Sequence, residues 1–300
     1  MVDDIMSISI IIPTRNRAKI LKKTLEKFVK IGGFFELIIV DGASQDETFE
    51  VVENLRKSHS DIRIKYHRSK EREGSPKASN VGIKLADGNF LTWFGDDMIV
   101  KNGELFKIIV EDFKNNPKVG VIGGKRIEVM EPTVDPSFYV KYGDILTRLT
   151  GFIFLDIFTD IRMATFVCAP IVVRREIGQG IKYDENYEGT AYREESDFTQ
   201  QAKQKGWKCL FEPKFKVYHF GQNKGGNRGQ MYETRMYWKS RNHTYYLLKN
   251  FNNNKLLLFW YILCGLVILF SYKPRFLRYI LVGFKDGMRL FFNTKFGNKI

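Results

Sequence analysis

The sequence is poor in cysteine and shows no export segment. Its three cysteines, Cys168, Cys209 and Cys264, lie far apart along the chain and mostly in apolar surroundings. This spacing excludes a disulfide framework and a zinc site built on paired cysteines. Near the N-terminus only residues 8–12 form an apolar run, which Pro13 ends, so we predict no secretory signal. A reducing, cytosolic compartment is therefore expected.

Acidic residues are also in deficit. The 300 residues include 48 Lys and Arg against 34 Asp and Glu, which gives a formal net charge of +14. This excess indicates an anionic partner: nucleic acid, a phospholipid surface or a phosphorylated small molecule. Hydrophobic residues make up 44% of the chain, which is enough for the core of one large or two small domains and excludes a disordered chain.

Strand-like and helix-like segments alternate through the first part of the chain. Strands are predicted at residues 7–12, 35–40, 62–66 and 119–122 and from residue 90, with helices between them. Alternation of this kind predicts an α/β fold with a mostly parallel central sheet and helices on both faces. Ligands of such sheets bind at the carboxyl ends of the strands, where Arg15, Asp41, Asp96 and Asp97 all fall.

Local signals predict further details. Ser44 and Glu47 have the spacing of a capping box, and Ser75 with Pro76 predicts a cap and a first-turn proline for a helix that ends near residue 86. Two short strands are predicted at residues 208–211 and 216–219, on either side of Pro213. The basic, glycine-rich residues 221–229 are either a mobile lid over an anionic ligand or an ordinary surface loop.

Two adjacent carboxylates, Asp96 and Asp97, follow the central apolar strand. Like charges at the rim of a core repel each other unless a cation joins them, and the candidates are Mg²⁺, Mn²⁺ or a Lys or Arg partner. The alternative is an acidic turn that caps the next helix. A second pair, Glu194 and Glu195, opens a predicted helix and could supply a general base, although helix-terminal electrostatics alone would also explain it.

These residues predict a chemistry if the ligand is a nucleoside diphosphate that carries a leaving group. A cation held by Asp97, with Asp96 nearby, would bridge the diphosphate oxygens. Asp41 would accept hydrogen bonds from the base or ribose, and Arg15, Arg17 or Lys77 would face the phosphates. Glu194 or Glu195 would accept a proton, and His219 could complete the metal shell.

Six segments carry a family resemblance when taken together in order. They are residues 9–17 (SIIIPTRNR), residues 39–48 (IVDGASQDET), Gly74 to Gly82 around Asn80, Asp96-Asp97, residues 194–197 (EESD) and residues 217–219 (VYH). Over about residues 7–250 the chain resembles the family 2 glycosyltransferases of the GT-A fold, inverting enzymes that transfer a sugar from a nucleotide donor. The resemblance implies a catalytic domain over residues 1–250.

The resemblance also implies roles for individual residues. It assigns Pro13, Thr14, Arg15, Arg17, Asp41, Lys77, Asn80 and Asp96 to the nucleotide sugar, and Asp97, Asp96 and His219 to Mn²⁺ or Mg²⁺. Glu195 would be the catalytic base, with Glu194 toward the acceptor. Two departures from the family pattern bear on this: Gly95 stands where many members have Asp, and Glu195 where most have Asp. The extra methylene of Glu moves its carboxylate by roughly 1 Å compared with Asp. Either the pocket accommodates this longer reach of Glu195, or Glu194 is the base instead.

The C-terminal residues 251–300 combine an apolar segment with basic charge. Residues 256–270 are uninterruptedly apolar, about 22 Å as a helix against a hydrocarbon core of about 30 Å. Residues 271–300 carry seven basic side chains against one acidic, and a basic amphipathic helix is predicted after Pro274. We expect a membrane-associated tail, bound through residues 256–292 to the cytoplasmic face of an anionic cell membrane as a peripheral, re-entrant or single-span element.

Two other functions fit part of the pattern. The triplet Gly95-Asp96-Asp97 and the basic charge also occur in nucleic-acid polymerases, but a second metal-binding motif in the right order is missing, so no nucleic-acid partner is expected. A non-catalytic nucleotide-sugar or membrane-binding module would lack the base, whereas Glu195 and Asp97 are present. The acceptor is expected to be a glycan or a lipid-linked molecule.

Overall fold

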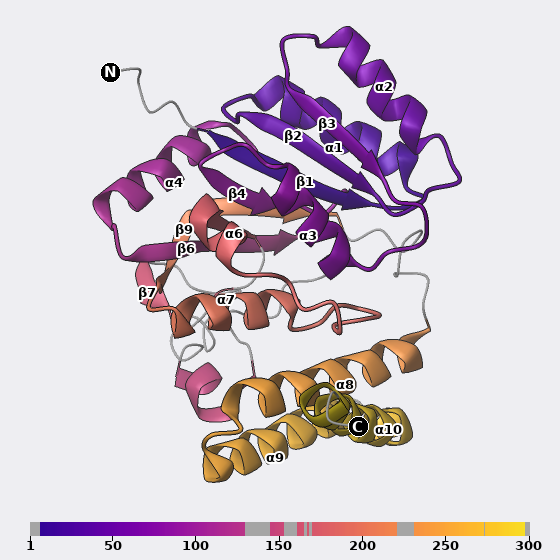
Figure 1. Ribbon diagram of the computed structural model, residues 1–300, viewed down its shortest axis with the longest axis vertical. Helices are drawn as coiled ribbons and strands as arrows, with labels where there is room; N and C mark the ends of the chain where they lie inside the picture. The colour runs from indigo at the N-terminus through magenta and orange to yellow at the C-terminus, as the bar shows by residue number, and fades with distance from the viewer. Residues whose placement is uncertain are drawn as a thin grey trace.

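A single mixed sheet forms the centre of the molecule (Figure 1). The computed structural model describes residues 7–129, 145–152, 161–164, 167, 170–220, 231–272 and 274–297. Within these residues the sheet has nine strands in the order β3-β2-β1-β4-β8-β6-β9-β5, and β7 pairs with β9. The strands are β1 (Ile8–Thr14), β2 (Glu36–Asp41), β3 (Ile64–Arg68), β4 (Phe90–Trp93), β5 (Met98–Ile99), β6 (Val119–Glu128), β7 (Arg162–Ala164), β8 (Ile171–Arg174) and β9 (Lys208–His219).

Strands β3, β2, β1 and β4 run parallel to one another, and β6 runs parallel to β9, whereas β8 lies between β4 and β6 and is antiparallel to both. The described helices are α1 (Ala18–Ile31), α2 (Thr48–Ser58), α3 (Ser75–Leu85), α4 (Glu104–Asn115), α6 (Arg175–Gly180), α7 (Glu194–Gln204), α8 (Tyr232–Phe251), α9 (Lys255–Tyr272) and α10 (Leu277–Phe296). The predicted α/β fold with a mostly parallel central sheet is therefore confirmed.

Alternating side chains of the central strands supply two separate cores. Ile10 and Ile12 of β1 pack with apolar residues of α1, α2 and α4, whereas Ile11 packs on the other face with α3, α6 and α7. A strand with both faces buried is apolar at every position, which explains the β-branched run in β1. Helix α3 comes especially close, because a Cβ on Gly82 would lie 2.3 Å from a methyl of Ile11.

The first strand ends later than its sequence predicts. Pairing between β1 and β4 ends at Ile11 and Trp93, and the Phe94 amide donates to the Ile11 carbonyl. Backbone groups of residues two apart in a strand point to the same side, so the nitrogen of Pro13 points to the same side as the Ile11 carbonyl, which faces β4. At Pro13, however, the pairing with β4 has already ended. The missing N–H therefore costs no ladder hydrogen bond, and β1 continues to Thr14 beside Asp41 of β2.

Two local predictions are wrong. Residues 208–219 form one strand, β9, and the register with β6 shifts near Pro213, as expected where proline falls at a bulge. The capping box is absent as well: the Ser44 hydroxyl accepts a hydrogen bond from the Asn16 amide, and the Asp46 carboxylate accepts from the Thr48 amide at the start of α2. Residues 221–229, the predicted lid, lie outside the described residues.

The last three helices pack together at the opposite end of the molecule from α2 (Figure 1). Helix α10 lies closely against α8, where a Cβ on Gly283 or Gly287 would come within 2.4 Å of a backbone oxygen of α8. Helix α9 contacts residues 145–152, because the Trp260 indole and the Tyr261 hydroxyl donate to the carbonyls of residues 149 and 148. Among the described residues, none of these helices has both the length and the apolar content that a membrane span requires.

Candidate functional site

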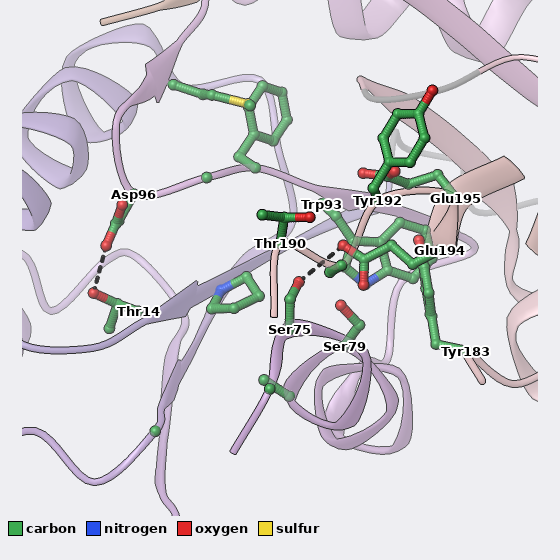
Figure 2. A pocket seen from close by; sticks show the side chains of 18 of the residues that line it. Thr14, Ser75, Ser79, Trp93, Asp96, Tyr183, Thr190, Tyr192, Glu194 and Glu195 are labelled. Carbon is green, nitrogen blue, oxygen red and sulfur yellow. Dashed lines mark hydrogen bonds between the residues drawn. The ribbon is translucent and has the colours of Figure 1, made fainter. Parts of the chain in front are cut away.

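The carboxyl ends of β1 and β4 open into a cavity of about 570 Å³. The loops after these strands, the start of α3 and the start of α7 supply most of its wall. Lining residues that carry polar or aromatic groups include Thr14, Arg15, Arg17, Arg72, Glu73, Ser75, Ser79, Trp93, Asp96, Asp97, Arg126, Phe152, Tyr183, Thr190, Tyr192, Arg193, Glu194, Glu195 and Lys239. Figure 2 shows Thr14 and Asp96 at one end of the cavity and Tyr192, Glu194 and Glu195 at the other.

The acidic pair at this edge is joined by a cation from α1's entry loop. The guanidinium of Arg17 donates to Asp96 Oδ1 at 2.5 Å and to Asp97 Oδ2 at 2.9 Å. The Thr14 hydroxyl donates to the second oxygen of Asp96, and all four side chains are buried. Of the two kinds of cation expected beside this pair, the structure therefore shows an arginine.

His219 lies beside the carboxylate of Asp97. Its Nε2 is 3.5 Å from Asp97 Oδ1, because β5 and β9 pair residue 98 with residue 219. The structure thus brings Asp96, Asp97 and His219 together as the family resemblance predicts.

We tested whether these residues suit a divalent cation. Searching the described residues finds no group of three or more His, Cys, Asp and Glu side chains placed to hold a metal. A Mg²⁺ or Mn²⁺ ion in a phosphate site takes one or two carboxylates from the protein and its remaining ligands from the substrate and water. Carboxylate and imidazole are donors that Mn²⁺ accepts, so Asp97 and His219 fit a cation shared with a diphosphate.

The second pair of acids occupies the first turn of α7. Arg193, the residue before the helix, has a left-handed backbone with φ 81°, and Ala191 has φ 54°. Strain at non-glycine residues of this kind concentrates at functional sites. The turn places both glutamates in the cavity wall at the positive end of the helix dipole.

The two glutamates differ in their surroundings. Glu194 is buried, and the Ser75 hydroxyl donates to its Oε1 at 3.1 Å, while its Oε2 has no hydrogen-bond partner among the described residues. Burial, together with the charge of Glu195, raises the pKa of Glu194 well above its usual value. Glu195 is partly exposed to solvent. Ser75, predicted as a helix cap, is instead the first residue of α3 and contacts this acid.

Asp41 closes the end of β2 next to the cavity. Its carboxylate accepts hydrogen bonds from the Ser44 amide at 2.8 Å and the Tyr66 hydroxyl at 2.6 Å. Burial and the hydrogen bond to Asp41 raise the pKa of Tyr66. Asp41 does not itself line the cavity, whereas its neighbour Gly42 and Arg15 do.

Besides Asp41, two residues predicted to bind the nucleotide sugar, Lys77 and Asn80, lie outside the cavity lining. Lys77 forms an ion pair with Glu73 at 2.9 Å, and Glu73 lines the cavity. Asn80 exchanges two hydrogen bonds of 2.9 Å with the backbone of Tyr183. These contacts give Asn80 a structural partner, and its predicted contact with a nucleotide sugar stays a prediction.

Several lining residues were not predicted as site residues: Ser75, Trp93, Arg126, Phe152, Tyr192, Arg193 and Lys239. Four of them had a nearby signal: Ser75 lies in the segment Gly74 to Gly82, Trp93 lies just before the Asp96–Asp97 pair, and Tyr192 and Arg193 precede the glutamate pair. Lys239 belongs to α8, which is far from the other site segments in sequence and reaches the cavity only through the fold.

The mixed sheet, with acids and arginines at its strand ends around one cavity, has the GT-A fold. Solved structures share this fold. The chain aligns with Staphylococcus aureus TarS residues 1–349, solved with UDP-GlcNAc, at a TM-score of 0.65 and 18% identity over 94% of this chain and 81% of that one. It aligns with mannosyltransferase PcManGT of Pyrobaculum calidifontis, solved with GDP-Man and Mn²⁺, at a TM-score of 0.63 and 17% identity over 92% and 73%.

The sequence pattern of glycosyl transferase family 2 matches residues 9–177, and the chain belongs to this family. It is therefore a glycosyltransferase.

Two curated relatives show how the similarity is distributed. The chain is 36% identical over 126 residues to a dolichyl N-acetyl-alpha-D-glucosaminyl phosphate 3-beta-D-2,3-diacetamido-2,3-dideoxy-beta-D-glucuronosyltransferase of Methanococcus voltae, a match that covers 39% of this chain and 38% of that one. It is 37% identical over 101 residues to a GalNAc(5)-diNAcBac-PP-undecaprenol beta-1,3-glucosyltransferase of Campylobacter jejuni, covering 33% and 32%. The matches thus span less than half of the length of these relatives.

Proposed function

We propose that the protein transfers a sugar, with inversion, from a nucleoside-diphosphate sugar to a hydroxyl of a lipid-linked or glycan acceptor. The observation that carries this proposal is that one cavity is lined by the Asp96–Asp97 pair and by Glu194 and Glu195. The names of the relatives support the acceptor class, because they include a dolichyl phosphate and an undecaprenyl diphosphate acceptor. The bound ligands of TarS and PcManGT support a nucleotide sugar as donor.

In the proposed reaction the acceptor oxygen attacks the anomeric carbon from the side opposite the diphosphate. The new C–O bond forms as the bond to the β-phosphate oxygen breaks, and the electron pair leaves with the nucleoside diphosphate. Asp97 and His219 would hold Mn²⁺ or Mg²⁺, which neutralises charge on the departing diphosphate when bound. Thr14 and Arg15 line the same cavity as Asp96, and they would fix the diphosphate and nucleoside of the donor.

Glu195 is the proposed general base that takes the acceptor proton. Burial favours the protonated form of Glu194, and a protonated carboxyl group cannot accept that proton. The more exposed Glu195 is therefore the member of the pair proposed to accept the proton. Glu194 would then face the acceptor as a hydrogen-bond donor, with its second oxygen held by Ser75.

A matched pair of variants tests this assignment. Glu195→Gln is expected to lower kcat by 10²–10⁴, the usual contribution of general-base catalysis. Glu194→Gln resembles the protonated residue and is expected to retain most of the activity. If Glu194→Gln is the more damaging change, Glu194 is the base. Asp97→Asn should remove Mn²⁺-dependent donor hydrolysis, and a wild-type protein that neither hydrolyses nor binds any nucleotide sugar would refute the proposed function.

We further propose that α9 and α10 bind an anionic membrane surface. Large apolar side chains on these helices are exposed: Leu256, Phe259, Trp260, Leu263, Val267, Leu277, Leu281, Val282, Phe292 and Phe296. Basic side chains lie on α10 among them, as in helices that lie in a membrane interface. Placement in the plane of the membrane fits the packing of both helices on α8.

Vesicle flotation tests the membrane contact. Phe259 is 69% exposed, and Phe259→Ser is expected to weaken binding to phosphatidylglycerol-containing vesicles severalfold while leaving the melting temperature unchanged. Phe35→Ser, which removes an exposed aromatic ring at the start of β2, is the control. Equal flotation of both variants and wild type would contradict the proposal.

A further inference from the structure

The end of the cavity away from Thr14 and Asp96 carries positive charge. Arg193 before α7 and Lys239 of α8 lie beside Tyr192 at this end, and Arg126 of β6 also lines the cavity; we call these three residues the cationic cluster. Two aromatic rings, Tyr192 and Phe152, stand beside them with their centroids 6.3 Å apart. Figure 2 places Tyr192 next to Glu195 and away from Thr14 and Asp96, so this end is the acceptor end if the donor lies along β1.

Arg193 is a buried cation, and within the described part of the chain it donates its hydrogen bonds to neutral groups. It is 2% exposed, and its guanidinium donates to the carbonyl of Gly151 at 2.6 Å and to Nδ1 of His243 at 3.1 Å. Burial and the charge of Arg193 lower the pKa of His243 well below its usual value, so the imidazole is neutral. Nη1 of Arg193 has no hydrogen-bond partner among the described residues.

A buried charge without an opposite charge is costly, and the surroundings of Arg193 offset only part of this cost. The rings of Phe152, Tyr192 and Tyr246 lie within 5.6 Å of the guanidinium carbon, which stabilises the cation. Because Arg193 is part of the cavity lining, its charge raises the affinity of this end of the cavity for an anion.

Lys239 extends the same charge toward the tail helices. Its Nζ lies 5.8 Å from the ring centroid of Tyr192. The next residue, Ser240, faces the other way and donates to the carbonyl of Ile280 in α10 at 2.7 Å. The cationic cluster therefore adjoins the helices whose apolar side chains are exposed, so a molecule held in a membrane surface would reach the cavity from this side.

We propose that the cationic cluster binds a phosphate or diphosphate group of the acceptor, and that this acceptor is a polyprenyl-phosphate type of lipid. The inference rests on the proposed sugar transfer and specifies its acceptor. Because the cluster lines the same cavity as Glu194 and Glu195, the acceptor phosphate lies close to the reacting hydroxyl.

The test measures binding to full-length protein saturated with Mn²⁺ and the nucleoside diphosphate that stabilises it most. The probes are farnesyl diphosphate, inorganic pyrophosphate and farnesol, each titrated in detergent. Farnesyl diphosphate is expected to bind, farnesol is not, and Lys239→Gln is expected to weaken farnesyl diphosphate at least tenfold. Lys84→Gln, an exposed lysine at the end of α3, is the matched control and should change nothing.

Other outcomes overturn parts of the inference. If pyrophosphate binds as tightly as farnesyl diphosphate, the cluster recognises the phosphate but the lipid assignment is wrong. If Lys239→Gln weakens the nucleoside diphosphate as much as farnesyl diphosphate, the cluster belongs to the donor site and the inference fails. Arg126→Gln should reproduce the Lys239→Gln result, and its failure to do so removes Arg126 from the cluster. A wild-type protein that binds no nucleoside diphosphate would refute the proposed function itself, which is a distinct result.

Discussion

Arg17 forms ion pairs with Asp96 and Asp97, the two carboxylates to which the family resemblance assigns a metal. We therefore predict that Arg17 competes with a divalent cation for these carboxylates. A divalent cation on Asp97 would have to replace the contact of 2.9 Å between this carboxylate and the guanidinium. A hydrogen bond to a charged group is worth about 1.5–3 kcal/mol. Arg17→Gln removes the competing cation, so Mn²⁺ should bind the nucleotide-free variant roughly 10- to 150-fold more tightly than the wild type.

The assay is a titration of Mn²⁺ followed by the electron paramagnetic resonance signal of the free ion. Lys22→Gln, which neutralises an exposed lysine of the same helix, is the control for the lost positive charge. With saturating nucleoside diphosphate the difference should shrink, because phosphate oxygens then supply both a partner for Arg17 and ligands for the ion. Equal or weaker Mn²⁺ binding by nucleotide-free Arg17→Gln, with an unchanged melting temperature, would refute this reasoning.

Three further predictions concern stability. Lys249→Met should lower the free energy of unfolding by about 3 kcal/mol in urea, because Lys249 contacts the buried Asp197 at 2.7 Å and this carboxylate would lose its counter-charge; a loss below about 1 kcal/mol would contradict it. Burial and a neighbouring glutamate raise the pKa of Asp112 from 3.8 to about 6, so its stabilising contribution is complete below pH 3.8 and lost as the pH rises through 6. Asp112→Asn should thus stabilise the protein by about 1 kcal/mol at pH 7.5, after allowance for solvent screening, and by nothing at pH 3.5, as thermal melts would show. Gly287→Ala should cost about 1–3 kcal/mol through overlap with a backbone oxygen of α8, whereas Gly297→Ala, with nothing within 4 Å of the new methyl, should be neutral.

The sequence predicted the sheet because its signals are local. Each buried strand is a short apolar run, and each of its helices has apolar residues at helical spacing, so β1, β2 and β4 could be located within a few residues. The convergence of Thr14, Asp96 and Asp97 followed from parallel strands alone. Glu194 and Glu195 could be placed in the same cavity only through the family resemblance, because 97 or more residues separate them from Asp97.

Features that depend on tertiary contact could not be predicted. Ser44 has the sequence of a cap, but its hydroxyl meets the amide of Asn16, 28 residues earlier in the chain. The contacts of Arg17 with Asp96 and Asp97 depend on the side-chain conformation of this one arginine, and the sequence does not distinguish it from Arg15, two residues earlier. Lys239 reaches the cavity because α8 packs against α7, where Lys249 and Asn250 contact Asp197, an arrangement that no local pattern encodes.

The contacts of α8 with the cavity and with α10 limit where this chain could be recombined with a relative. One of its residues, Lys239, belongs to the cavity wall, and its neighbour Ser240 is bonded to α10. Recombination at the short turn between α8 and α9 would pair a foreign α10 with a native α8, and the glycine contacts that let them touch would be mismatched. A viable chimera would therefore have to take α8 and α10 from the same parent.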